Sequence, residues 1–107
     1  MASYQVELTA DARKEIRNAP GHLRARILDV LHTLEQNYSP PGSRQLDLAK
    51  LDVPAEPEVS LWRVRLDKWR IVYVVDRRDD VIAVLAVRQR PPYQYEDLDR
   101  LLRQRRR

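Results

Sequence analysis

The stretch LWRVRLDKWRIVY, residues 61–73, decides the fold. In its first half, residues 61–66, the apolar residues Trp62, Val64 and Leu66 alternate with a second set that includes Arg63 and Arg65. This alternation is typical of a β-strand with two different faces. The second half opens an apolar run, residues 69–76, with the composition of a central strand. Only Asp67 and Lys68 separate the halves, which predicts a tight hairpin loop. Because the usual glycine is missing, a turn of three or four residues is the alternative.

A third strand follows this hairpin. Residues 77–80 read Arg-Arg-Asp-Asp and predict a second polar turn. Residues 81–87 form the longest apolar run of the chain and predict a strand buried on both faces. That run is far shorter than the roughly 20 residues of a membrane helix, so no membrane-spanning segment is expected. Beyond Pro91-Pro92, residues 95–103 predict a short terminal helix.

The residues before the hairpin predict a strand and two helices. Residues 4–8 alternate apolar and polar side chains, which indicates a short half-buried strand. Thr9 suits the N-cap of a helix over residues 10–18, and Pro20-Gly21 ends that helix. From about Pro20, apolar residues recur every three or four positions as far as Tyr38, which predicts a second helix.

This order of elements predicts an α+β fold, with a helical hairpin on one face of an antiparallel sheet. Residues 43–60 are expected to hold a turn of helix and an acidic, proline-stiffened loop. Strand alternation places Arg63 and Arg65 on the face opposite the apolar residues of their strand. If the helices cover the apolar side, both arginines and Arg70 are exposed on or near the open face. We expect one domain spanning residues 1–107.

The composition of the 107 residues excludes several classes of site. The absence of cysteine removes disulfides, thiolate nucleophiles and cysteine-ligated zinc, and it fits a reducing cytoplasm. Two glycines are too few for a P-loop or a dinucleotide-binding loop. His22 and His32 lie near opposite ends of one predicted helix, so no metal site is expected. The N-terminal residues lack the apolar region of a secretory signal. We therefore expect a cytoplasmic protein without metal or cofactor.

Positive charge is concentrated in the second half of the chain. Residues 1–60 carry seven Lys and Arg against nine Asp and Glu, a net charge of −2. Residues 61–107 carry thirteen against seven, a net charge of +6. A basic half on a small domain indicates an anionic partner, with nucleic acid as the first candidate. The alternative is a solvated arginine-rich surface without a specific partner.

Arginine and tyrosine are the remaining candidates for chemistry. Five arginines lie on or beside the predicted three-stranded unit: Arg63, Arg65, Arg70, Arg88 and Arg90. Tyr93 and Tyr95 follow just past its last strand. Guanidinium groups match phosphate oxygens bidentately, and a tyrosine offers a stacking surface for a base as well as a phenol. The pattern indicates phosphate binding, with ordinary solvent-facing residues as the alternative.

These residues resemble the RelE/ParE toxin superfamily of bacterial toxin–antitoxin systems. Members typically show a strand of alternating apolar and basic residues, a short turn, and then aromatic-Arg-apolar-apolar-Tyr, as residues 61–73 do. Residues 4–12 resemble the opening strand and first helix of the family, and residues 86–90 resemble the end of its last strand. The resemblance covers nearly the whole chain apart from residues 43–60. It implies the strand and helix order β-α-α-β-β-β.

The RelE branch implies a metal-independent, ribosome-dependent endoribonuclease that cuts messenger RNA and so inhibits translation. In that reaction the 2′-hydroxyl attacks the adjacent phosphate and leaves a 2′,3′-cyclic phosphate and a 5′-hydroxyl. By motif, Arg63 and Arg65 match the paired phosphate-binding positions, and Arg70 matches the arginine that stabilises the transition state. Arg90 matches the basic residue that binds the backbone or serves the leaving group. The functional tyrosine of the branch lies several residues later, so Tyr93 or Tyr95 is expected to act as base or stacking platform. Arg88 is expected to be a further phosphate contact.

One departure concerns the base. RelE-like enzymes often have lysines where this chain has Arg63 and Arg65, and arginine does not lose its proton at ordinary pH. The expected base is therefore a tyrosine whose pKa is lowered by adjacent arginines.

The alternative within the superfamily is a ParE-like toxin, which binds and poisons DNA gyrase without nuclease activity. Either activity implies a cognate antitoxin on a separate chain. That antitoxin is expected to be acidic and partly disordered, and to fold on the basic face.

Overall fold

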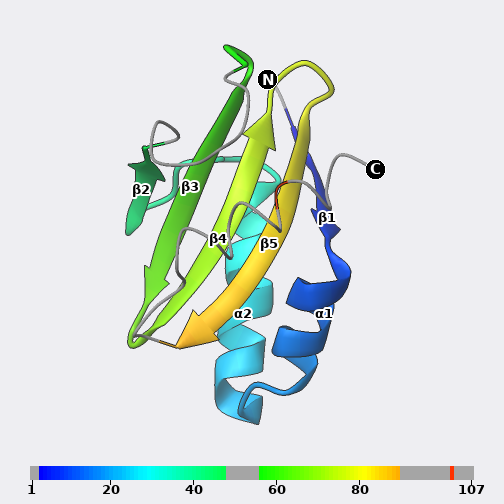
Figure 1. Cartoon of the computed structure of the whole chain (residues 1–107). Coiled ribbons are helices and arrows are strands. Elements are labelled where there is room, and N and C mark those ends of the chain that lie inside the picture. Colours follow the sequence, from blue (N-terminus) through cyan, green and yellow to red (C-terminus); the bar gives the residue numbers. More distant parts are fainter. Residues whose placement is uncertain (1–2, 48–55, 90–101, 103–107) are drawn as a thin grey trace.

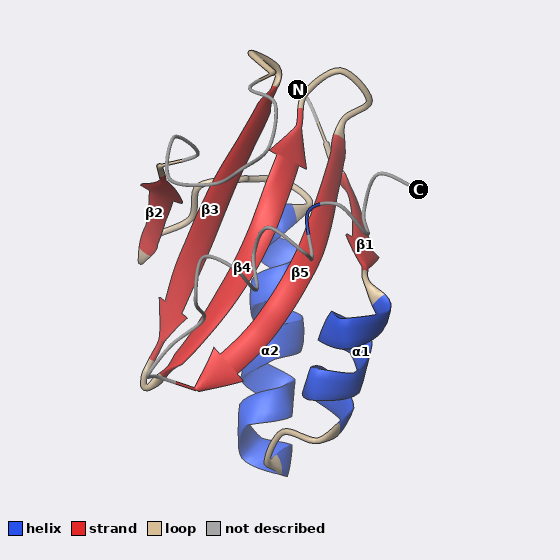
Figure 2. Cartoon of the chain, in the orientation of Figure 1, coloured by secondary structure: helices blue, strands red, loops and turns tan. Residues whose placement is uncertain are grey.

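The computed structural model describes residues 3–47, 56–89 and 102. Two helices cover one face of a five-stranded sheet whose strand order is β1-β5-β4-β3-β2 (Figures 1 and 2). This arrangement confirms the predicted α+β fold with both helices on one side. Within the described part of the chain, no helix has the length and apolar character needed to cross a membrane.

The N-terminal elements follow the sequence pattern closely. Strand β1 (Gln5–Leu8) leads through Thr9 into helix α1 (Ala10–Arg17), and helix α2 (Gly21–Leu34) follows. The Thr9 hydroxyl accepts a hydrogen bond from the Ala12 amide at 3.2 Å, which satisfies one of the unpaired donors of the first turn.

Helix α2 ends earlier than the apolar spacing predicts. Tyr38 lies beyond its last residue, in the connection to the sheet. There the Tyr38 ring makes edge-to-face contacts with Trp62, at 5.5 Å between centroids, and with Tyr4, at 5.9 Å. An apolar residue at helical spacing thus reaches the core from a loop, because aromatic packing rather than a further helical turn holds it in place.

The three-stranded antiparallel unit is present as predicted. It comprises β3 (Val59–Leu66), β4 (Trp69–Asp76) and β5 (Val81–Gln89). The turn between β3 and β4 has two residues, because Leu66 pairs directly with Trp69. Asp67 adopts the left-handed conformation, with φ of 55°, that glycine usually supplies in such turns. An aspartate tolerates this conformation better than most residues, which explains how the turn forms without glycine.

The sheet differs from the prediction in two respects. It is mixed rather than wholly antiparallel, because β1 pairs in parallel with β5. A fifth strand, β2 (Ser43–Leu46), pairs antiparallel with β3 at the sheet edge, where a turn of helix was expected. Gly42, with φ of 88°, turns the chain into β2 and accepts a hydrogen bond from the Arg65 amide at 3.0 Å. Leu46 then packs against the sheet as a strand residue.

Both faces of the sheet carry apolar clusters. The larger cluster joins the helices to one face, where Ile27 and Leu31 pack with sheet residues such as Ile71 and Tyr73. The smaller cluster lies on the opposite face and contains Leu61, Val72, Val74, Leu85, Ala86 and Leu102. Strand β5 is therefore buried on both faces, as predicted. The expectation that the second face is open was wrong for this part of the sheet, because the six residues of this smaller cluster are buried there.

Candidate phosphate-binding site

Three arginines lie side by side across the middle strands of the sheet. The strand register pairs Arg65 of β3 with Arg70 of β4, and Arg70 with Arg88 of β5. Residues directly opposite on neighbouring antiparallel strands have Cβ atoms about 4.5–5.5 Å apart and share a face. We call Arg65, Arg70 and Arg88 the arginine row. It lies at the end of the sheet where β3 turns into β4 (Figure 1).

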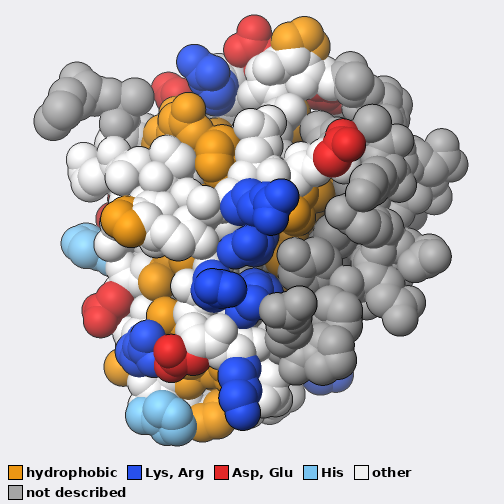
Figure 3. All heavy atoms as spheres, turned by 90° about the vertical axis from the view of Figure 1, so that its left-hand side faces the viewer, with side chains coloured by type: hydrophobic (Ala, Val, Ile, Leu, Met, Phe, Trp, Pro, Cys, Tyr) orange, Lys and Arg blue, Asp and Glu red, His pale blue; other side chains and the backbone are white. Residues whose placement is uncertain are grey.

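A second pair of arginines lies beside the arginine row. Arg63 shares the face of Arg65, two residues away on β3, and it pairs across the strands with Arg44 of β2. Seen from the β2 side, lysine and arginine side chains gather in a column down the middle of the molecule (Figure 3). Arg44 was not among the predicted site residues, since its strand was not predicted. Once β2 is known, the register alone brings Arg44 to the site.

The five guanidinium groups differ in exposure. Arg44 and Arg65 are exposed, whereas Arg63 and Arg88 are half-buried. Among the described residues, Arg44, Arg63 and Arg65 form no ion pair and no side-chain hydrogen bond. Like charges in such proximity repel one another, and a bound polyanion would relieve that repulsion. The surface is therefore suited to a phosphate chain.

Arg70 is buried, with 7% of its surface exposed, so the expectation that it is exposed was wrong. Its Nη1 donates hydrogen bonds to the carbonyl oxygens of Asp67, at 3.0 Å, and Trp69, at 2.9 Å. The side chain thus folds back on the turn that precedes it. These carbonyls hold the guanidinium of Arg70 in place in the middle of the arginine row.

Asp67 links this cation to the helical layer. While its carbonyl accepts from Arg70, its carboxylate forms an ion pair with Arg26 of α2. The turn is therefore held from the sheet side and from the helix side at once.

A carboxylate from α1 reaches the other end of the arginine row. The Glu15 Oε2 atom accepts a hydrogen bond from Nε of Arg88 at 2.7 Å, and Oε1 accepts one from the Val87 amide at 2.9 Å. Glu15 was not predicted to lie at the site. Nothing in the sequence near residue 15 signals a partner that lies 73 positions away.

The remaining predicted residues, Arg90, Tyr93 and Tyr95, lie outside the described residues. The buried Tyr73 is unsuited to be the base. Burial raises the pKa of its phenol far above the ordinary value, and its hydroxyl donates to the Tyr38 carbonyl at 2.6 Å on the helical side. In residues 3–47 and 56–89, no group of three or more His, Cys, Asp or Glu side chains is arranged to hold a metal ion.

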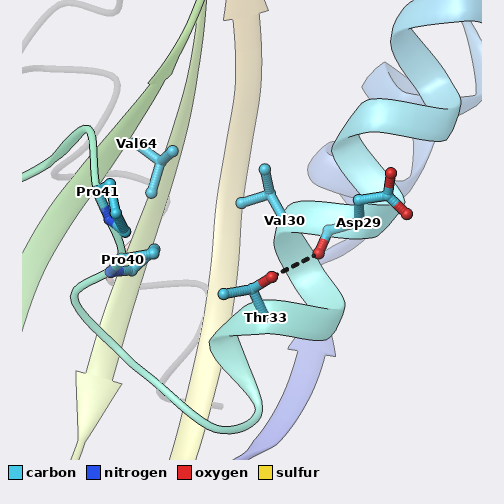
Figure 4. A pocket seen from close by; sticks show the side chains of 6 residues that line it. All are labelled: Asp29, Val30, Thr33, Pro40, Pro41 and Val64. Carbon is cyan, nitrogen blue, oxygen red and sulfur yellow. Dashed lines mark hydrogen bonds between the residues drawn. The ribbon is translucent and has the colours of Figure 1, made fainter.

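A pocket of about 240 Å³ lies on the helical side, between α2 and the chain before β2 (Figure 4). Val30, Pro40, Pro41 and Val64 give it apolar walls, and Asp29 and Thr33 line its helical side. Val64 faces the helices, whereas its neighbours Arg63 and Arg65 face the other way. The pocket is thus separated from the arginine row by the sheet.

Comparison with known proteins identifies a family. Residues 6–91 match the family model described as ParE toxin of type II toxin-antitoxin system, parDE. This match covers most of the chain and includes the whole arginine row. No curated protein matches the chain.

Solved structures of RelE proteins share the fold. The RelE–RelB complex from Pyrococcus horikoshii OT3 matches with a TM-score of 0.71 and 23% identity, over 85% of this chain and 99% of that chain. The toxin–antitoxin complex RelBE2 from Mycobacterium tuberculosis matches with a TM-score of 0.62 and 18% identity, over 82% and 99%. The isolated E. coli RelE toxin matches with a TM-score of 0.61 and 16% identity, over 95% and 98%.

Proposed function

This chain belongs to the family of ParE toxins of type II toxin–antitoxin systems, and from that premise we propose that it is an RNA-cleaving toxin. Its target would be messenger RNA on the ribosome, in the cytoplasm. The observation that carries the proposal is the arginine row, in which Arg65, Arg70 and Arg88 meet on three adjacent strands. A gyrase-binding surface does not by itself require a buried, rigidly held cation such as Arg70.

The proposed reaction is attack of a ribose 2′-oxygen on the adjacent phosphorus. A base removes the 2′-proton, the O2′–P bond forms, the P–O5′ bond breaks, and the leaving 5′-oxygen takes up a proton. Arg63 and Arg65 would bind the phosphate, with Arg88 as a further contact. Arg70 would stabilise the negative charge that develops on the phosphate oxygens, because its fixed position requires no reorganisation during the reaction.

Proton transfer is assigned to residues beyond β5. The arginines cannot remove the 2′-proton, since arginine stays protonated. Tyr93 or Tyr95 is the proposed base or stacking platform, and Arg90 is proposed to bind the backbone or serve the leaving group. No metal takes part in this scheme, because the arginines supply the positive charge that a metal ion would otherwise provide.

The proposed partners are the ribosome with its messenger RNA and a cognate antitoxin. Two of the similar structures are complexes of a toxin with an antitoxin, which supports such a partner here. An acidic, partly disordered antitoxin segment would neutralise the five arginines by folding over them.

A second candidate function is poisoning of DNA gyrase. The family-model match to ParE toxins favours it. The presence of Arg63 and Arg65 where RelE-like enzymes often have lysines also favours it, because a lysine is a possible base and an arginine is not. Basic residues at all four positions of the RelE motif favour the nuclease.

One experiment separates the two activities. Purified protein is added to a translating extract, and the 5′ ends of the transcripts are mapped. A parallel assay follows supercoiling by gyrase. We expect cleaved messenger RNA with 5′-hydroxyl ends and unchanged supercoiling. Arg77→Ala, at an exposed position far from the arginine row, is the matched control and should cleave as the unmodified protein does. Intact transcripts together with gyrase–DNA cleavage complexes would replace the nuclease by the gyrase poison.

A further inference from the structure

Strand β5 continues beyond the strand that pairs with its outer edge. The pairing of β1 with β5 ends at Leu8 and Val84, whereas β5 extends to Gln89. Backbone groups along an unpaired strand edge need other partners, because an unsatisfied buried amide or carbonyl is costly. Along the last third of β5, which ends in Arg88 and Gln89, the backbone groups on this edge therefore need hydrogen-bond partners that β1 does not provide.

The N-cap residue of helix α1 and one residue within the helix contact this edge of β5, the first where the β1 pairing ends and the second beyond it. The Thr9 hydroxyl lies 3.0 Å from the Val84 carbonyl oxygen, and one helical turn and a half later Glu15 accepts from the Val87 amide at 2.9 Å. Beyond the end of β1, the Glu15 carboxylate therefore accepts the hydrogen bond from β5 that a backbone carbonyl of a neighbouring strand would otherwise accept. Glu15 is held there by the packing of Ala12 and Ile16 into the core on the same helix.

The second oxygen of the Glu15 carboxylate binds Arg88 of the arginine row. Glu15 Oε2 accepts from Nε of Arg88 at 2.7 Å, a short distance typical of a charge-assisted hydrogen bond. Both side chains are about three-quarters buried, with 25% and 21% of their surfaces exposed. A contact at Nε fixes the plane of the whole guanidinium, because Nε joins it to the flexible stem. Arg88 is thereby held in a single orientation beside Arg70.

We infer that Glu15 is a positioning residue of the toxin, which aims Arg88 at a substrate phosphate from the helical layer. This inference rests on the proposed RNA-cleaving function. Glu15 touches no substrate itself, since it acts through Arg88. Its negative charge also lowers the repulsion between Arg88 and Arg70, so the arginine row keeps its shape before RNA binds.

Substitution by glutamine separates charge from shape. In Glu15→Gln, an NH2 group replaces one of the two carboxylate oxygens, so in the observed geometry either the Val87 amide or Nε of Arg88 loses its acceptor. We expect KM for programmed ribosomes to rise about tenfold, with kcat changed less than twofold, because a phosphate contact made equally in the ground and transition states is weakened. Glu7→Gln, at an exposed position of β1, makes the same charge change away from the site and should alter neither constant.

A double-mutant cycle shows whether Glu15 acts through Arg88. In the Arg88→Ala background, Glu15→Gln should change KM by less than twofold, because the group that Glu15 positions is gone. Arg88→Lys provides a second route should Glu15→Gln fold poorly, since lysine lacks Nε while the Glu15–Val87 contact remains. We expect this variant to raise KM about tenfold as well. Independent, multiplicative effects of the two substitutions would overturn the inference.

A readout without cleavage distinguishes this inference from the proposed function. In the full-length ¹⁵N-labelled protein, the Nε–H signal of Arg88 should exchange slowly and should move on titration with inorganic phosphate. Glu15→Gln should abolish both properties, and Glu7→Gln should abolish neither. If these results hold but no RNA is cut, the nuclease proposal fails and the positioning role stands. If RNA is cut but neither the Arg88 Nε–H signal nor KM changes in Glu15→Gln, the positioning role fails and the nuclease proposal stands.

Discussion

The two ends of strand β4 hold their arginines in opposite ways. At the far end, Arg78 lies against carboxylates. Its Nη2 is 3.0 Å from Asp76 Oδ2 and 3.1 Å from Glu56 Oε2, and its amide donates to Asp76 Oδ1 at 3.0 Å. At the near end, Arg70 donates to two backbone carbonyls, and Arg63 and Arg65 beside it bind no carboxylate among the described residues.

This difference bears on the proposed function, in which the arginines at the near end bind phosphate. The hydrogen bond to Asp76, followed by the attraction of the same carboxylate, raises the pKa of Arg78 above its ordinary value, and the charges cancel locally. A carbonyl orients a guanidinium but brings no net charge, and Arg63 and Arg65, which form no ion pair among the described residues, keep the near end of β4 positive. The same residue type thus pairs with carboxylates just beyond one end of β4 and donates to backbone carbonyls at the other end.

The largest expected effect is on Arg70. Arg70→Ala should lower the rate of RNA cleavage by about 10²- to 10³-fold, because one preorganised charge contact is lost. Arg70→Lys should recover part of it, since a point charge replaces a planar fork. Cleavage rates in a translating extract measure both effects, and circular dichroism checks the fold. Arg78→Ala is the matched change at the other end and should leave the rate within twofold. Equal losses for Arg70→Ala and Arg78→Ala would erase the distinction between the ends.

The second prediction concerns salt. Three to four phosphate contacts imply that RNA affinity falls by about 10- to 100-fold between roughly 50 and 200 mM salt. Arg65→Ala should reduce the magnitude of the slope of log K against log salt by about 1, because one phosphate contact is lost, whereas Arg77→Ala should not change it. Fluorescence anisotropy with a short single-stranded RNA gives both slopes. An affinity independent of salt would show that the arginine row is not the contact surface.

The third prediction concerns Asp76, of which 3% is exposed. Asp76→Asn removes the buried charge that faces Arg78 and weakens the hydrogen bond from the Arg78 amide. We expect the free energy of unfolding to fall by about 1–2 kcal/mol, with the cleavage rate unchanged. Urea denaturation measures the loss. A drop in cleavage at full stability would mean that the far end also takes part in the reaction.

The smallest expected effect distinguishes the two turns. Asp67 and Asp80 both adopt left-handed conformations, with φ of 55° and 54°. Replacement of either by glycine keeps the backbone geometry. Asp67→Gly also removes the ion pair with Arg26, so we expect cleavage to fall two- to fivefold, on the order of the up to 1 kcal/mol that an exposed pair contributes. Asp80→Gly should cleave normally. Equal rates for the two glycine variants would show that the Arg26 contact has no role in placing Arg70.

The sequence predicted those features that depend on neighbouring residues. The alternation in residues 61–66 identified β3 and the shared face of Arg63 and Arg65, because side-chain direction in a strand follows residue parity. The hairpin loop at Asp67-Lys68 was also predicted correctly, because only these two residues separate the two strand-like runs. Residue patterns along the chain also gave the order of strand, two helices and three-stranded unit, and the family resemblance agreed with it.

Features that depend on distant pairing were missed. Strand β2 is four residues long and exists because it pairs with β3, so its own sequence carries little signal. The parallel pairing of β1 with β5 and the contact of Glu15 with Arg88 both join residues more than 70 positions apart. Arg70 is buried and donates hydrogen bonds to carbonyls of the turn, and composition reveals neither feature.

That long-range pairing also determines when the fold of the toxin can be completed during its synthesis. Contacts between distant residues form late, because the entropy of closing the intervening loop must be overcome first. Gln5 of β1 pairs with Val81, and Arg88 completes the arginine row, so neither is in place until the ribosome has made β5. At about 5–20 residues per second, the nascent chain therefore spends seconds with its first strand unpaired and its row incomplete. An antitoxin already present in the cell would meet the toxin at the moment of its assembly.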